Sequence, residues 1–276
     1  MPATNTRPHN VDEIRNTVYA RCKRWLAVAL SLKGLLFAGG TLTVLTSVDS
    51  LIAPLVIAAL AAASELAMWR SDFVKSVAEA VQRKLDFENS FGWRITNADL
   101  RDVLARYATN LPRLQEQSTS NYFASQDPPG LQRALQNLQE SAWWSKHLTE
   151  SMWKVCLIAI CLLVVFCMVL LLTSIQTISD QTVLASIARV VTSAILLLFS
   201  LNLLRSMVGY FTFSKKAEKA EDAASKLLAG GSIDDIEPIK LWQEYQLARA
   251  SASLLPTWMW KLRQKKLNQL WQAYHN

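Results

Sequence analysis

The sequence predicts an all-α membrane protein in which four transmembrane helices form two hairpins and helix extensions form a cytoplasmic bundle. The first observation is a set of four apolar runs that are nearly free of charge: Leu26–Val48, Leu51–Met68, Val155–Thr173 and Val183–Leu204. About 20 helical residues, rising 1.5 Å each, cross a hydrocarbon core of about 30 Å. Each run is therefore about as long as one membrane span requires.

The second observation is the position of charge around these runs. The two hairpin tips, Asp49-Ser50 and Ser174–Thr182, contain two Asp and no Lys or Arg. Because positive residues stay on the cytoplasmic side, both tips are predicted to face outward, with both termini in the cytoplasm. The predicted segments are residues 1–25 (cytoplasmic), 26–69 (first hairpin), 70–152 (cytoplasmic helices), 153–213 (second hairpin) and 214–276 (cytoplasmic helices).

The net charge of +7 is concentrated beside the predicted spans. Five Lys and Arg against two acids precede the first run, ten against seven follow residue 213, and the middle segment balances ten against ten. This distribution is typical of topology signals and contacts with anionic lipid, so DNA or RNA is not an expected partner. The first apolar run begins too late and is too long for a cleavable signal peptide.

Helical periodicity continues outside the runs. No helix breaker separates the second run from Arg70–Glu88, where Phe73, Val77, Val81 and Leu85 form an apolar stripe. The segment Leu131–Met152 is predicted to lead into the third run, with a seam at Leu131, Leu135, Leu138 and Ala142. The fourth run is predicted to extend through Ser214–Leu228 and to end at Gly230-Gly231.

The last predicted helix, Pro256–Asn276, combines an apolar face with basic residues. Leu267, Leu270, Trp271 and Tyr274 share that face, and the segment contains four Lys or Arg and no acidic residue. This composition fits a helix at an anionic membrane surface. The same face can equally dock on the cytoplasmic bundle.

Ionisable residues inside apolar runs are costly in lipid and are functional candidates by default. Lys33 and Glu65 differ in predicted depth by only about 6 Å. They are interpreted as an ion pair that joins the first hairpin, as a polar lining for a water-filled path, or as side chains that reach toward the inner interface.

The fourth run contains Arg189, and Asn202 and Arg205 lie near its inner end. If a pore forms, this run is the one predicted to line it. The alternative is ordinary helix packing through hydrogen bonds.

A polar face occurs on the predicted helix before the third run. Arg133, Asn137, Glu140 and Trp144 are spaced 4, 3 and 4, about 200° from the leucine seam. Guanidinium binds phosphate and indole stacks on bases, so this face suits a nucleotide. The alternative is a solvated helix face.

Motifs for catalysis and for metal binding are absent from the sequence. It contains no phosphate-binding Gly loop, no HExxH, no GxSxG and no His/Cys set with metal-ligand spacing. We therefore expect neither enzymatic activity nor a cofactor.

Several short motifs resemble the SMODS-associated four-transmembrane effector family of bacterial antiphage defence. They are Val81–Phe87, Gly92-Trp93, Asn121–Phe123 and the helix that carries Arg133, Asn137 and Trp144. The chain departs from the family pattern at Arg83, which replaces Glu, and at Asp86-Phe87, which is inverted. It also lacks the Trp-Asp pair of the family's helix. Under this resemblance Trp93, its neighbour Arg94 and Tyr122 join the candidate ligand contacts.

The resemblance implies a pore-forming effector of abortive infection. A cyclic oligonucleotide made during phage infection would bind the cytoplasmic part, drive homo-oligomerisation and permeabilise the membrane. Two alternatives remain open on the residues alone. One is a membrane anchor or scaffold that recruits a cytoplasmic partner, and the other is a small constitutive channel or transporter.

Overall fold

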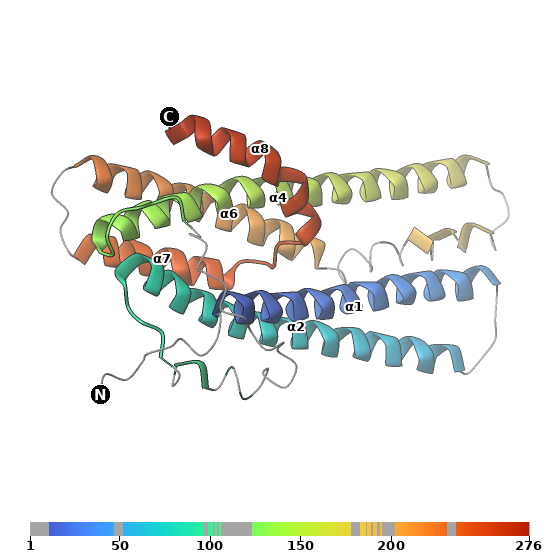
Figure 1. Cartoon of the computed structure of the whole chain (residues 1–276). Coiled ribbons are helices and arrows are strands. Elements are labelled where there is room, and N and C mark those ends of the chain that lie inside the picture. Colours follow the sequence, from blue (N-terminus) through green and yellow to red (C-terminus); the bar gives the residue numbers. More distant parts are fainter. Residues whose placement is uncertain are drawn as a thin grey trace. The chain divides into compact units, whose positions relative to one another are not determined.

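All secondary structure in the described part of the chain is helical, which confirms the all-α prediction. The computed structural model describes residues 11–46, 52–96, 99–101, 103, 105, 123–177, 183–185, 187–188, 190–191, 194, 202–230 and 236–275. Its long helices are α1 (Val11–Thr46), α2 (Ile52–Phe91), α4 (Leu131–Thr177), α6 (Leu203–Ala229), α7 (Ile236–Ser251) and α8 (Thr257–His275), shown in Figure 1.

The predicted helix extensions are confirmed. Helix α2 continues unbroken through Arg70–Glu88, and α4 is one helix of 47 residues that carries the leucine seam and the third apolar run. Helix α2 ends at Phe91 and is followed by Gly92, whose φ of 73° is the left-handed conformation that glycine adopts most readily. The Gly92 N–H donates to the Glu88 carbonyl at 2.9 Å, and a Cβ at Gly92 would lie 3.0 Å from Pro129 Cβ.

The chain forms two compact units. Unit 1 contains Met1–Lys23, Asp72–Thr149 and Thr212–Asn276, and unit 2 contains Arg24–Ser71 and Glu150–Phe211. Helices α1, α2, α4 and α6 each contribute residues to both units, whereas α7 and α8 belong to unit 1 alone.

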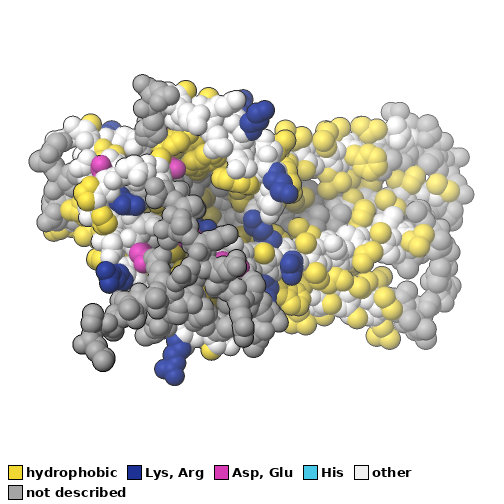
Figure 2. All heavy atoms as spheres, in the orientation of Figure 1, with side chains coloured by type: hydrophobic (Ala, Val, Ile, Leu, Met, Phe, Trp, Pro, Cys, Tyr) yellow, Lys and Arg dark blue, Asp and Glu magenta, His cyan; other side chains and the backbone are white. Residues whose placement is uncertain are grey.

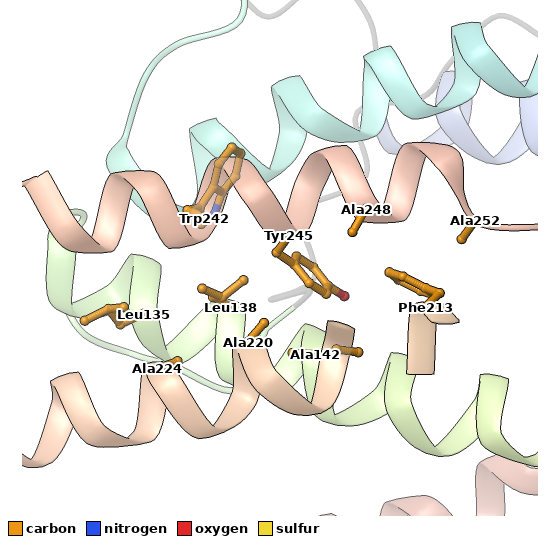
Figure 3. Packing of buried hydrophobic residues seen from close by; sticks show 11 residues of the cluster. Leu135, Leu138, Ala142, Phe213, Ala220, Ala224, Trp242, Tyr245, Ala248 and Ala252 are labelled. Atoms are coloured by element: carbon orange, nitrogen blue, oxygen red, sulfur yellow. The ribbon is translucent and has the colours of Figure 1, made fainter. Parts of the chain in front are cut away.

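One core of unit 1 lies among α4, α6 and α7 (Figure 3). The predicted seam residues Leu135, Leu138 and Ala142 are buried in it. They pack with a row of small residues on α6, where Ala217, Ala220 and Ala224 allow close helix approach. The buried Tyr245 hydroxyl donates to the Ser141 carbonyl at 2.9 Å, so the polar end of this side chain is satisfied.

A second core of unit 1 joins α1 and α2. Val11, Ile14, Val18 and Cys22 recur every three or four residues along α1 and are buried. They meet the predicted stripe of α2, in which Val81 and Leu85 are buried and Phe73 and Val77 are partly buried.

Helix α8 packs on α4 within unit 1. Leu267 and Trp271 are buried with Trp143 and Leu148, and the Trp143 and Trp271 rings lie 5.0 Å apart. The predicted docking alternative is confirmed for these two residues, while Leu270 is exposed and the side chain of Tyr274 lies outside the described part.

Unit 2 contains strongly apolar helices. Two stretches of the described residues, Val11–Leu42 and Leu131–Thr173, are long and apolar enough to cross a membrane. Figure 2 shows hydrophobic side chains over the segments of α1, α2 and α4 that belong to unit 2. The predicted runs Leu51–Met68 and Val183–Leu204 extend outside the described residues, so the four-span arrangement stays a prediction.

Overpacking tests the small-residue row of α6. We expect Ala224→Leu to lower the free energy of unfolding by about 1–3 kcal/mol, because the added carbons have no space beside α4 and α7. The matched control is Ala80→Leu at an exposed position of α2, which should change it by no more than about 0.5 kcal/mol. Equal effects in detergent unfolding titrations would contradict the packing.

Candidate functional site

A cavity of about 650 Å³ lies inside unit 1. Helical spacing brings its charged residues together, since Arg15, Tyr19 and Lys23 recur every fourth residue of α1. The other lining residues come from α2 (Lys75, Glu79, Gln82), α4 (Glu140, Ser141, Trp144, Ser145, Leu148, Thr149), α6 (Phe213), α7 (Arg249), α8 (Trp260, Asn268) and from Asn16, Phe123 and Ala252–Leu255.

A buried ionic network lies at one wall of this cavity, which its members Glu79, Gln82 and Arg249 line. Arg249 of α7 pairs with Asp86 of α2 at 3.1 Å and with Glu79 at 3.7 Å. Asp86 is 1% exposed and also accepts hydrogen bonds from Gln82 at 2.7 Å and Gln246 at 2.8 Å. Burial alone would lower the pKa of Arg249, but the carboxylates of Asp86 and Glu79 raise it well above its usual range. The charge of Arg249 is therefore neutralised by two carboxylates of α2, and these ion pairs hold α7 against α2.

Glu79 has a second partner in the wall, because it also accepts a hydrogen bond from the Tyr19 hydroxyl at 2.7 Å. Arg15 pairs with Asp12 at 3.2 Å and donates to Gln82 at 3.3 Å. These contacts occupy the carboxylates and guanidinium groups of the wall with one another.

Two lysines give the cavity its remaining positive charge. Lys75 donates to the carbonyls of Ala250, at 2.9 Å, and Ala252, which lie where α7 ends, and it pairs with no carboxylate of the described residues. Burial lowers the pKa of Lys75, while the nearby carboxylates of Glu79 and Asp72 act in the opposite direction. Lys23 lines the cavity without an ion pair to any residue in the described part of the chain.

Aromatic side chains supply the other walls. Trp144 of α4 and Trp260 of α8 are in contact, with ring centroids 5.2 Å apart. Phe123, Tyr19 and Phe213 line the same space. Cavities of about 300–1,000 Å³ hold small molecules. A combination of two lysines and several rings suits a ligand that carries both negative charge and a planar group.

Only two of the four residues of the polar face predicted on α4 line the cavity. Glu140 and Trp144 line the cavity, and Glu140 accepts the backbone N–H of Ala124 at 2.9 Å. Arg133 instead donates to the Asp127 carbonyl at 3.0 Å. Asn137 is 1% exposed and donates to Ser90 at 3.1 Å. The alternative of a solvated face is wrong for Asn137, because α2 covers it.

The other predicted ligand residues lie elsewhere. Trp93 stacks on Phe87 at 5.0 Å and lines a separate cavity of about 340 Å³ between α2 and α7. Arg94 is exposed and lines neither cavity. Tyr122 lies outside the described residues.

The predicted Lys33–Glu65 ion pair is present in unit 2, with Lys33 Nζ 2.8 Å from Glu65 Oε1. Lys33 is 1% exposed and Glu65 is 67% exposed, so the carboxylate covers a buried ammonium. Asn202 has a φ of 53° immediately before α6, and its carbonyl accepts the Ser206 N–H at 2.8 Å. Arg205 is exposed on α6, and Arg189 lies outside the described residues.

Sequence reasoning missed the cavity residues on α1, α2 and α7. The sequence does contain a pattern that indicates these residues. Arg15, Tyr19 and Lys23 are four positions apart, as are Lys75 and Glu79, and both sets lie beside apolar stripes. Among the described residues, no cluster of three or more His, Cys, Asp or Glu could hold a metal ion.

Comparison with protein-family models, with curated proteins and with solved structures finds no match to this chain. The resemblance to the four-transmembrane effector family therefore rests on the motifs quoted above and stays a proposal.

A double-mutant cycle tests the Lys33–Glu65 pair. Lys33→Met and Glu65→Gln should each destabilise the protein, and the double variant should lose less than the sum by at least about 0.5 kcal/mol, because the two charges compensate each other. Unfolding titrations in detergent measure the three free energies.

The control cycle uses Lys154 and Glu150, an exposed pair at 2.6 Å on α4 in the same unit. Its coupling should not exceed about 0.5 kcal/mol. Strictly additive losses at Lys33 and Glu65 would contradict a stabilising pair.

Proposed function

We propose that this chain is a membrane effector that binds a cyclic-nucleotide second messenger and then oligomerises and permeabilises the bacterial inner membrane during antiphage abortive infection. In this proposal the runs Leu26–Val48, Leu51–Met68, Val155–Thr173 and Val183–Leu204 span the membrane as two hairpins. The termini and unit 1 lie in the cytoplasm.

The observation that carries the proposal is the continuity of α4. The first part of this helix contributes Glu140 and Trp144 to the cavity, and the later part carries the more apolar of the two stretches that, among the described residues, could cross a membrane. A ligand that alters the packing of α4 in unit 1 therefore acts on a helix that continues into unit 2.

Exposure of the apolar stretch supports a lipid environment. Large apolar side chains of α4 are exposed, among them Ile158, Leu162, Val165, Phe166 and Val169, whereas Cys156, Ile160 and Cys167 on another face are buried. A patch of this size is unfavourable in water, whereas hydrocarbon solvates it without cost.

The cavity supports an anionic ligand with planar parts. We assign the phosphates to Lys23 and Lys75, because within the described part of the chain neither ammonium group forms an ion pair with a carboxylate. We assign a base to the aromatic wall of Trp144 and Trp260, where Glu140 offers an acceptor for base N–H groups.

Ligand binding would act through differential affinity. A messenger can drive assembly only to the extent that it binds the assembled state more tightly than the resting state. Moving the equilibrium from 1:99 to 99:1 requires a preference of about 10⁴-fold, or about 5.5 kcal/mol. Helices shared between the two units provide a direct physical connection for such a preference.

A scaffold function is the second candidate, and one surface favours it. Helix α7 exposes Ile236, Ile239 and Leu247 at helical spacing, beside the cavity that Phe87, Trp93 and Trp242 line. An exposed apolar stripe beside an aromatic pocket is typical of a protein-binding surface.

Binding measurements test the ligand assignment. We expect Lys75→Gln and Lys23→Gln each to weaken the binding of cyclic dinucleotides or trinucleotides about tenfold or more, since a charged hydrogen bond contributes about 1.5–3 kcal/mol. Isothermal calorimetry on the detergent-solubilised protein gives the Kd values.

Arg94→Gln is the matched control, because Arg94 is an exposed cation of the same unit outside the cavity. Lys75→Gln could weaken binding through structure alone, because Lys75 also holds the end of α7. Lys23→Gln is measured as well for this reason. Unchanged affinity in both lysine variants, or a loss in Arg94→Gln alone, would refute the assignment.

Membrane potential tests the effector function. Induced expression in bacteria should depolarise the cells only when a cyclic-nucleotide synthase is expressed with it, because the resting state keeps the membrane intact. Lys75→Gln should reduce the depolarisation while the protein still inserts. A membrane potential that stays intact with every synthase tested would contradict the effector function and favour the scaffold function.

A further inference from the structure

Helix α8 has two distinct faces. Its inner face packs against the rest of unit 1, where Met259, Leu267 and Trp271 are buried at intervals that follow the helical repeat. Its outer face leaves Trp258 50% exposed and Leu262 69% exposed. The docking of α8 therefore does not account for the large apolar residues near its beginning.

The outer face is also strongly basic. Lys261 and Lys265 alternate with Trp258 and Leu262 at spacings of three and four, and Lys266 lies beside them. All three lysines are exposed, and none pairs with a carboxylate of the described residues. The segment Thr257–His275 contains no Asp or Glu, so its charge is not neutralised within the helix.

This combination selects one kind of surface. Lysines on a helix face attract anions, but Trp and Leu between them gain nothing from phosphate alone. At the boundary of an anionic bilayer, the lysines meet headgroups while the indole ring and the leucine enter the acyl boundary.

We propose that the outer face of α8, formed by Trp258, Lys261, Leu262, Lys265 and Lys266, binds anionic phospholipid at the surface of the membrane that the chain spans. The proposal rests on the membrane location given under the proposed function and is independent of the cavity ligand. It replaces the face predicted from the sequence, because Leu267 and Trp271 already pack on α4.

Lysine footprinting on the unmodified full chain tests the proposal. The protein is reconstituted into nanodiscs of phosphatidylcholine alone or with phosphatidylglycerol, and a water-soluble acylating reagent is followed by peptide mass spectrometry. Lys261, Lys265 and Lys266 should react several-fold more slowly in discs that contain phosphatidylglycerol. Lys226 of α6 and Lys240 of α7, which are exposed and lie further along the chain from the second hairpin, serve as internal controls and should react equally in both.

A second measurement uses the variant Trp258→Ala/Leu262→Ala, in which the lysines remain. We expect this variant to lose most of the protection, because the apolar anchors hold the lysines at the headgroups. Equal reactivity of the wild-type lysines in both disc types would overturn the proposal. Protection that depends on protein concentration rather than lipid charge would assign the face to a second copy and would also overturn it.

The outcome separates this proposal from the proposed function. Protein that enters discs but shows no protection contradicts only the lipid face. Protein that fails to enter discs contradicts the spans, and the same footprint is then measured with added phosphatidylglycerol vesicles, where unchanged reactivity again overturns the lipid face.

Discussion

The buried ion pair between Arg249 and Asp86 is the contact on which the organisation of unit 1 depends. It joins residues 163 positions apart, and Glu79, Gln82 and Gln246 complete the network around it. Removing one partner of such a pair typically costs about 3–5 kcal/mol, because the other charge is left buried. By fixing the end of α7 against α2, the network also fixes the connection to α8 and thereby the wall of the cavity formed by Ala252–Leu255.

Alternating roles along single helices connect this network to the rest of the molecule. The same turns of α2 that hold Asp86 and Glu79 also present Val81 and Leu85 to the core with α1. Helix α4 presents Leu135 and Leu138 to α6 and α7, and Glu140 and Trp144 to the cavity. Because each helix serves a core and a polar site on neighbouring faces, a small rotation of one helix changes both.

The sequence predicted the features that depend on local pattern. Helix continuity, the seam at Leu135, Leu138 and Ala142, and the Lys33–Glu65 pair all follow from spacing and depth along one or two adjacent helices. The cavity could not be predicted in the same way, because Lys23, Lys75 and Arg249 meet only after distant helices pack. For the same reason the sequence places Asn137 and Arg133 on a ligand face, whereas in the structure Asn137 donates a hydrogen bond to Ser90 of α2 and Arg133 donates to the Asp127 carbonyl.

The most direct test of this account is a double-mutant cycle on Asp86 and Arg249. Asp86→Asn, Arg249→Met and the double variant are unfolded in detergent, with the exposed pair Glu237 and Lys240 as the reference cycle. The account predicts a coupling of at least about 1.5 kcal/mol for the buried pair. Faster amide exchange in α7 should accompany each single substitution. Additive losses, with the exchange of α7 unchanged, would contradict the central role of this contact.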